Sequence, residues 1–236
     1  MSLVDFDGIL LIDKPAGPTS HDIVDIIRNS YRIKKVGHCG TLDPAATGLL
    51  TILLGKATKL SEKLMSDDKV YVGSVKLGET TNTYDAEGQI ESHKQVPHLS
   101  IDTLQEEANK FLGDQMQIPP MVSAIKINGT PLYKLARKGQ KVDRKERFIH
   151  LYKFIISEYK PPFAWFKIAC TKGTYIRSLA HDFGNSLGCG GHLSGLRRTV
   201  SGKFKVSNAT TLEELTSLSP SDLNKRVIPI LKTFSS

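Results

Sequence analysis

The chain has 236 residues, which is enough to bury a sizeable core in one large domain or two modest ones. Hydrophobic residues make up 39%, charged residues 24% and aromatic residues 7%, values typical of a globular protein, which excludes a disordered or fibrous chain. The formal net charge of +8 favours a polyanionic partner but says nothing about chemistry.

Cysteine content and hydropathy predict a cytoplasmic protein. Cys39, Cys170 and Cys189 are too few and too widely spaced for a disulfide framework, so we expect a reducing compartment. The N-terminal stretch has no basic region of the kind that begins a signal peptide. The apolar stretch 48–55 is too short to cross a bilayer, which needs about 20 residues, so we expect no membrane association.

In the N-terminal part of the chain, the short apolar run 8–12 predicts a buried strand, followed by a turn. Thr19 or Ser20 can cap a helix with an apolar face at helical spacing, formed by Ile23, Val24, Ile26 and Ile27. Residues 37–50 read GHCGTLDPAATGLL and predict a shaped loop around Asp43, because Gly and Pro weaken regular elements.

Alternating helix and strand signals follow. Residues 57–66 have the spacing of a second helix, and the β-branched run 69–78 predicts a strand. The polar stretch 80–100 predicts irregular structure with a turn at 85–88. A helix signal then runs to Gly113, with Asp102 as its capping acid.

The C-terminal half predicts two strands, at 148–159 and 164–171, and a helix over 174–188 that ends on glycine. A last helix follows Thr210 or Thr211, with capping-box spacing to Glu213 or Glu214. No internal repeat or linker is evident, so we expect one α+β domain over residues 1–236 with an inserted arm.

The segment 126–147 is strongly basic, with eight Lys or Arg residues against Asp143 and Glu146. One interpretation is a solvated helix face and loop. The other is an arm that grips the phosphates of a nucleic acid.

Two ligand-site interpretations fail on spacing. Gly48 and Gly55 have six residues between them, and Ala57 follows the lysine, so GLLTILLGKAT is no phosphate-binding P-loop. A zinc site from His38, Cys39, Cys189 and His192 would lack a paired C-x-x-C knuckle, so we expect no metal.

The stretch 170–182, CTKGTYIRSLAHD, combines a strand end, a Lys-Gly turn and a helix start. It presents Tyr175 and Arg177 at a rim where backbone N–H groups are also free. An arginine near a helix start is more often a surface charge than a catalytic partner, so on these residues alone the functional interpretation stays open.

Six motifs resemble those of TruB-type tRNA pseudouridine synthases, in the same order from about residue 8 to residue 202. They read DKPAGPTS, GHCGTLDPAATGLL, KVYVGSVKLG, PPMVSAIKINGTPLYKLARKG, CTKGTYIRSLAHD and GHLSGLRRTVSG. The resemblance implies a mixed, largely antiparallel sheet flanked by helices, with an inserted basic RNA-binding arm at about 120–147. It also implies an isomerase, an intramolecular transferase that converts uridine-55 in the T-loop of tRNA to pseudouridine.

The resemblance also implies the roles of individual residues. Asp43 matches the catalytic aspartate, Tyr71 the tyrosine that stacks on the target base, and Arg177 the arginine that pairs with the aspartate. Substrate-binding positions are matched by His38, Tyr175 and Leu196, and in the basic segment by Lys126, Lys138 and Lys141. Lys14 and Pro15 fall in a motif that is mainly structural.

This set makes chemical sense. Exchanging an N–C for a C–C glycosidic bond needs no redox step and no outside atom, so we expect no cofactor. An ionised carboxylate can act as nucleophile or base, and an arginine keeps it charged and aimed. A flipped base needs aromatic and apolar replacements for its stacking partners.

The chain departs from the family pattern at two residues and at its end. Val122 stands where tyrosine is usual, and Cys39 where threonine is common. The chain stops soon after the last motif, so we expect no full C-terminal RNA-binding domain. We expect tRNA, bound through its T-loop and stem, as partner of a monomer with no protein partner.

Two rival hypotheses remain. A protein that only binds or refolds tRNA would have no need of an acid facing phosphate-rich RNA, so the set Asp43, Tyr71 and Arg177 argues against it. A metal-dependent nucleic-acid hydrolase would lose activity in excess EDTA.

Overall fold

The computed structural model describes residues 6–123, 126–127, 129–132, 135, 140 and 142–233. They form two compact units: unit 1 comprises Met1–Tyr71 and Arg197–Ser236, and unit 2 comprises Val72–Leu196. Two strands have residues in both units, β4 (Lys69–Leu77) and β12 (Gly191–Ser201).

Unit 1 is built on β1 (Gly8–Lys14) and β3 (Thr47–Leu54), which pair antiparallel along their whole length. On its other side β3 pairs antiparallel with β2 (Val36–Cys39) and, at Arg197 and Arg198, parallel with β12. Three short strands complete the sheet: β13 (Phe204–Lys205), β14 (Thr210–Thr211) and β15 (Ile228–Pro229).

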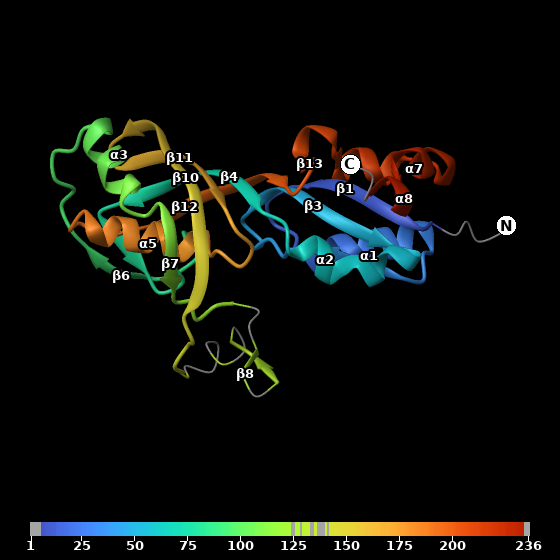
Figure 1. The fold of residues 1–236 in the computed structure, drawn as a ribbon, viewed down its shortest axis with the longest axis horizontal. Coiled ribbons are helices and arrows are strands. Elements are labelled where there is room, and N and C mark those ends of the chain that lie inside the picture. Colours follow the sequence, from blue (N-terminus) through green and yellow to red (C-terminus); the bar gives the residue numbers. More distant parts are fainter. Residues whose placement is uncertain are drawn as a thin grey trace. The chain divides into compact units, whose positions relative to one another are not determined.

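Helices cover this sheet. Helices α1 (Ser20–Tyr31) and α2 (Ser61–Met65) lie on one side of β1 and β3, and the C-terminal helices lie on the other (Figure 1). The latter are α6 (Leu212–Ser217), α7 (Pro220–Arg226) and α8 (Ile230–Thr233), and two 3-10 turns lie at Gly55–Leu60 and Val206–Asn208. Because both faces of the sheet are covered, β1 and β3 are almost continuously buried rather than alternating.

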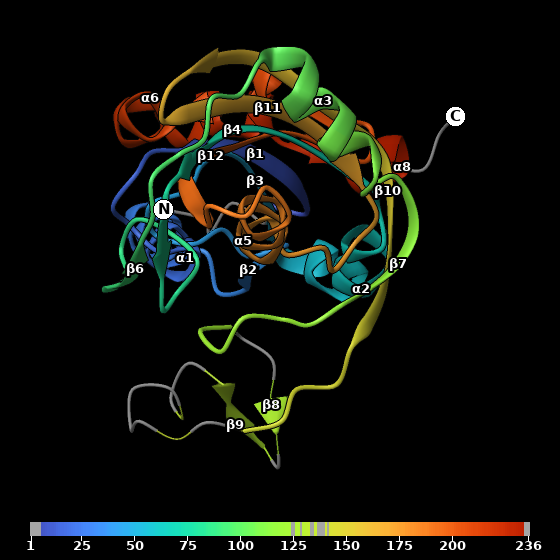
Figure 2. The same ribbon diagram turned by 90° about the vertical axis from the view of Figure 1, so that its left-hand side faces the viewer.

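Unit 2 contains an antiparallel ladder of β7 (Gly113–Gln117), β10 (Arg147–Lys160) and β11 (Phe163–Cys170), continued by β4 and β12. Helix α5 (Ile176–Ser186) packs Phe183 against Phe154 of β10, with 5.2 Å between the ring centroids. Helix α3 (Ile101–Asn109) lies beside β10 (Figure 2), where the Gln105 side chain accepts the Ile156 N–H at 2.8 Å and donates to the Phe154 carbonyl at 2.9 Å. The hairpin of β8 (Lys126–Ile127) and β9 (Thr130–Pro131) lies beyond the end of β10 (Figure 1).

The structure confirms the expected α+β class and most of the expected elements. Helix α1 starts after Thr19, whose hydroxyl forms a capping box with Asp22, and α6 starts after Thr211 with the same arrangement to Glu214. In the part of the chain described above, no helix is long and apolar enough to cross a membrane.

Three local predictions were wrong. The loop expected over 37–50 is confined to residues 40–46, because both its flanks join the sheet as β2 and β3. The stretch 80–100 is not wholly irregular, since β5 (Glu79–Thr81) and β6 (Ile90–His93) pair across the turn at 85–88. The cap of α3 is Ser100, whose hydroxyl accepts the Thr103 N–H, and not Asp102.

Candidate active site

Asp43 lies in unit 1, on the loop 40–46 between β2 and β3, and its side chain is half-buried. The loop turns tightly after it, since the Ala46 N–H donates to the Asp43 carbonyl at 3.1 Å. The residues before and after Asp43 are both held by side chains from elsewhere in unit 1.

Ser20, at the start of α1, holds the residue before Asp43. Its buried hydroxyl donates to the Leu42 carbonyl at 3.1 Å and accepts the Leu42 N–H at 2.9 Å. A single side chain therefore satisfies both backbone groups of Leu42 and ties the loop to the helix.

Lys14, at the end of β1, holds the residue after Asp43. Its ammonium donates to the carbonyls of Pro15, Pro18 and Pro44 at 2.8, 2.8 and 3.0 Å, and the side chain is fully buried. The loop and the turn after β1 are thus joined through one cation, which agrees with a structural role for the motif that contains Lys14.

Arg198 of β12 ties the first residue of the loop to β3. The side chain is 1% exposed and donates from Nε to the Leu49 carbonyl at 2.8 Å and from Nη2 to the Gly40 carbonyl at 2.7 Å. Gly48 has a φ of +99°, and a Cβ there would lie 2.3 Å from the Arg198 carbonyl oxygen. The glycine at position 48 is therefore required by the chain itself, both by its conformation and by this close approach.

His38 and Tyr71 also lie in unit 1. His38 is on β2 opposite Ile52 and is half-buried, and its Nδ1 is buried without a hydrogen-bond partner among the described residues. Burial lowers the pKa of His38, so the imidazole is neutral at neutral pH. Tyr71 is the last residue of this part of unit 1, on β4, and is 9% exposed.

Arg177 lies in unit 2, in the first turn of α5, and is 5% exposed. Its Nη1 is 3.3 Å from Oδ2 of Asp85, and the guanidinium also donates to the carbonyls of Thr83 and Val122, at 3.2 and 2.8 Å. The alternative of a solvated surface charge is therefore wrong for Arg177. Residue 122 binds Arg177 through its backbone carbonyl, so this contact does not depend on which side chain stands at that position.

Tyr175 is the N-cap residue of α5, and its backbone is held by Gln117 at the end of β7. The buried Gln117 amide accepts the Tyr175 N–H at 2.8 Å and donates to the Tyr175 carbonyl at 3.0 Å. Leu196, on β12, is half-buried.

The expected site residues are thus distributed over both units, Asp43, His38 and Tyr71 in unit 1 and Tyr175, Arg177 and Leu196 in unit 2. The pairing of Asp43 with Arg177 stays a prediction. Of the basic residues, Lys126 is on β8, whereas Lys138 and Lys141 lie outside the described residues.

Four residues that position the site were missed by sequence reasoning: Ser20 was considered only as a cap, Asp85 only as a turn residue, and Gln117 and Arg198 had no role. No local signal singles out Arg198, because the adjacent Arg197 has the same charge and instead pairs with Asp13.

The cysteines are buried in the structure. Burial raises the pKa of Cys39 to about 11, so its thiol is protonated and donates to the Ser61 carbonyl at 3.6 Å. Within the described ranges, no group of three or more His, Cys, Asp or Glu side chains could hold a metal ion.

Comparison with known proteins identifies the family. A sequence model described as "TruB family pseudouridylate synthase (N terminal domain)" matches residues 28–176, and one described as "tRNA pseudouridylate synthase B C-terminal domain" matches residues 177–232. The chain belongs to the TruB family. It is therefore a pseudouridine synthase, an isomerase, as the six motifs indicated.

Curated relatives agree over nearly the whole chain. The "tRNA pseudouridine synthase B" of Opitutus terrae is 47% identical over 226 residues, which cover 96% of this chain and 94% of that protein. The protein of the same name from Syntrophotalea carbinolica is 45% identical, over 95% of this chain and 73% of its own length.

Solved structures show the same fold in this TruB-family chain. A chain in the "Crystal Structure of a Cbf5-Nop10-Gar1 Complex" matches with a TM-score of 0.76 and 30% identity, over 98% of this chain and 62% of that one. A chain in the "Structure of H/ACA RNP bound to a substrate RNA containing 2'-deoxyuridine" matches with a TM-score of 0.71 and 28% identity, over 95% and 60%. The expected pseudouridine synthase fold is confirmed.

Proposed function

We propose that this TruB-family chain isomerises uridine-55 in the T-loop of tRNA to pseudouridine, with Asp43 as its catalytic carboxylate. The relatives named for this activity support the substrate. The observation that carries the proposal for Asp43 is the fixed backbone on both sides of it: Ser20 holds Leu42 and Lys14 holds Pro44. A carboxylate held in this way loses little freedom when it meets the reacting nucleotide.

The reaction needs a group that acts while uracil turns over. The bond from C1′ of the ribose to N1 breaks, a bond from C1′ to C5 forms, and the hydrogen on C5 is released as N1 gains one. An ionised carboxylate can attack C1′ or C6 as a nucleophile, or remove a proton as a base. All atoms of the product come from the substrate, so the balance requires no cofactor.

Arg177 is proposed to pair with Asp43 and to keep it ionised. The contacts with Asp85 and two carbonyls fix the plane of the guanidinium, a group whose five N–H donors can bind several acceptors at once. Its burial strengthens its attraction for a carboxylate compared with a solvated arginine.

The remaining site residues are proposed to hold the flipped nucleotide and the opened loop. Tyr71 stacks on the target base, while Tyr175 and Leu196 line its pocket, which offsets the few kcal/mol that unstacking costs. His38, neutral at neutral pH, contacts the loop by hydrogen bonding, and Lys126, Lys138 and Lys141 bind phosphates. We propose that residues 1–236 form one catalytic domain, which acts as a cytoplasmic monomer.

The test is a tRNA transcript that carries tritium at C5 of its uridines. Wild-type protein should release one tritium per transcript, and a transcript with cytidine at position 55 should release none. Release from both transcripts would show a different target position, and release from neither would contradict the proposed activity.

A further inference from the structure

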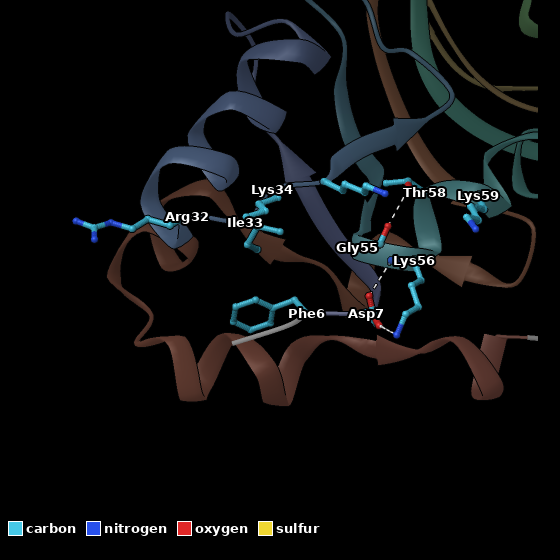
Figure 3. Close-up of a pocket in the computed structure, with 10 residues that line it drawn as sticks. Phe6, Asp7, Arg32, Ile33, Lys34, Gly55, Lys56, Thr58 and Lys59 are labelled. Atoms are coloured by element: carbon cyan, nitrogen blue, oxygen red, sulfur yellow. Dashed lines mark hydrogen bonds and ion pairs between the residues drawn. The ribbon is translucent and has the colours of Figure 1, made fainter. Parts of the chain in front are cut away.

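A pocket of about 470 Å³ lies in unit 1, between the end of α1 and the turn that follows β3 (Figure 3). Its wall is formed by residues of the segments 32–35 and 55–59, together with Phe6 and Asp7. The Gly55 N–H joins the two segments by donating to the Lys35 carbonyl at 2.9 Å. Five cationic side chains line it: Arg32, Lys34, Lys35, Lys56 and Lys59.

The pocket has a large excess of positive charge. Its one acid is Asp7, which already accepts the Lys56 N–H at 2.7 Å and lies 2.9 Å from the Lys56 ammonium. These contacts lower the pKa of Asp7, so it stays ionised and engaged with Lys56. The side chains of Arg32, Lys34, Lys35 and Lys59 have no hydrogen bond or ion pair with any residue that the structure describes.

Four like charges around one hollow repel each other, and a bound anion would remove that repulsion. All five cations are exposed rather than enclosed. A small free anion is best held by convergent, desolvated donors, whereas exposed lysines attract a polyanion through many weak, salt-dependent contacts. The pocket therefore fits a polyphosphate backbone better than a small ion.

The pocket lies far from Asp43 within unit 1. Helix α1 starts at Ser20, which is bonded to the residue before Asp43, and reaches the pocket after 12 residues, or about 18 Å at about 1.5 Å per residue. Strand β3 starts at Thr47, at the end of the same loop, and reaches the pocket at Gly55, which corresponds to about 26 Å at about 3.3 Å per residue. Both elements therefore give a separation of roughly 20 Å.

We propose that this pocket binds phosphodiester groups of the substrate RNA, outside the target loop. A separation of roughly 20 Å corresponds to several base pairs of an A-form RNA duplex, so the bound phosphates belong to the stem. The identity of the RNA rests on the proposed function, but the binding of an RNA backbone does not require turnover.

The test replaces Lys34, Lys35 and Lys59 together by glutamine. Lys56 is kept because it holds Asp7. The control replaces three other exposed lysines, Lys153, Lys167 and Lys205, by glutamine, which removes the same charge elsewhere. The pocket variant should bind tRNA transcript about 10- to 100-fold more weakly near 0.1 M salt, and its log–log salt slope should fall by about 2, since each lost contact removes about 0.7 to 0.9.

RNA hairpins with long and short stems test whether the pocket binds phosphates of the stem. A hairpin with eight base pairs should show the loss of affinity in the pocket variant, and one with two base pairs should not, because its phosphates do not reach the pocket. Equal affinity of the pocket variant and the control for the long hairpin would overturn the proposal. A loss of the same size for both hairpins would also overturn it.

A free phosphate ion is tested separately. If inorganic phosphate raises the melting temperature of wild-type protein but not of the pocket variant, while both bind tRNA equally, the site takes a free anion and the RNA assignment is wrong. Binding is measured without turnover. If wild-type protein releases no tritium, the proposed function is contradicted. If the pocket variant nevertheless binds the long hairpin more weakly than wild-type protein does, this inference still stands.

Discussion

Arg177 and Asp85 form an ion pair inside unit 2, with side chains that are 6% and 14% exposed and 3.3 Å between Nη1 and Oδ2. Asp85 is itself fixed, because Oδ1 accepts the Glu87 N–H at 3.1 Å and the Thr83 hydroxyl at 2.5 Å. The position of the guanidinium is therefore set by the turn at 85–88 as well as by α5.

Asp85→Ala should leave Arg177 as a buried charge without this partner and lower the free energy of unfolding by about 3 kcal/mol or more. Asp85→Asn keeps an oxygen that can accept from Arg177, so its loss of stability should be smaller. Asp85→Ala should lower kcat more than it raises KM for tRNA, because the guanidinium is no longer held in position, and Asp85→Asn should lower kcat less. Urea unfolding and single-turnover kinetics measure the two effects. Glu106→Ala, at an exposed acid of α3 in the same unit, should change neither, and normal kcat in Asp85→Ala would contradict a positioning role.

Asp43→Asn removes the negative charge of the side chain but keeps its shape. The side-chain volume is kept, so fold and base pocket should survive, and tRNA affinity should be equal or slightly greater. Catalysis should fall by many orders of magnitude, because an amide is a poor nucleophile and base. The variant should bind transcript and release essentially no tritium from C5. Release near the wild-type rate would show that Asp43 is not the catalytic residue.

Gly48→Ala and Gly113→Ala form a matched pair for the backbone of the catalytic loop. Both glycines have positive φ, +99° and +89°, so both variants incur the conformational cost of about 1–2 kcal/mol. Only at position 48 does the new Cβ collide with backbone, 2.3 Å from the Arg198 carbonyl oxygen, whereas nothing lies within 4 Å at position 113. Gly48→Ala should therefore lower the melting temperature clearly more than Gly113→Ala, and should also slow turnover. Equal melting temperatures would contradict this account of the loop.

The basic segment 126–147 should grip phosphate. Changing Lys138, Lys141 and Lys145 together to glutamate should weaken tRNA binding and flatten its salt dependence, since each lost contact reduces the log–log slope by about 0.7 to 0.9. The same charge reversal at Lys153, Lys167 and Lys205 serves as the control. Unchanged affinity and slope in the first variant would rule out the arm.

No metal should be needed for the isomerisation, because the reaction requires no Lewis acid. Tritium release should be the same after dialysis against EDTA and in its presence. Loss of activity that returns on adding a divalent cation would favour the metal-dependent alternative. Elemental analysis of protein never exposed to a metal column checks the same point, and stoichiometric zinc would overturn it.

Local signals predicted much of the fold. The capping boxes of α1 and α6 involve residues three apart, and the apolar runs of β10 and β11 need no distant partner to be recognised. Predictions failed where neighbouring signals compete. Ser100 and Asp102 can both cap a helix, and the backbone at position 100, with φ −99° and ψ 165°, decides for the serine. The β5–β6 hairpin was missed because strands of three and four residues leave too little pattern to read.

By itself, the sequence determined the family, the reaction class and the candidate residues Asp43, Tyr71 and Arg177, because short motifs in a fixed order are a property of the chain alone. The tertiary structure decided what holds those residues. Arg198 reaches Gly40 across 158 positions of sequence, and Tyr175 meets Gln117 across 58. Contacts over such separations form only when strands and helices pack, and they bury charged and polar groups whose satisfaction no local pattern reveals.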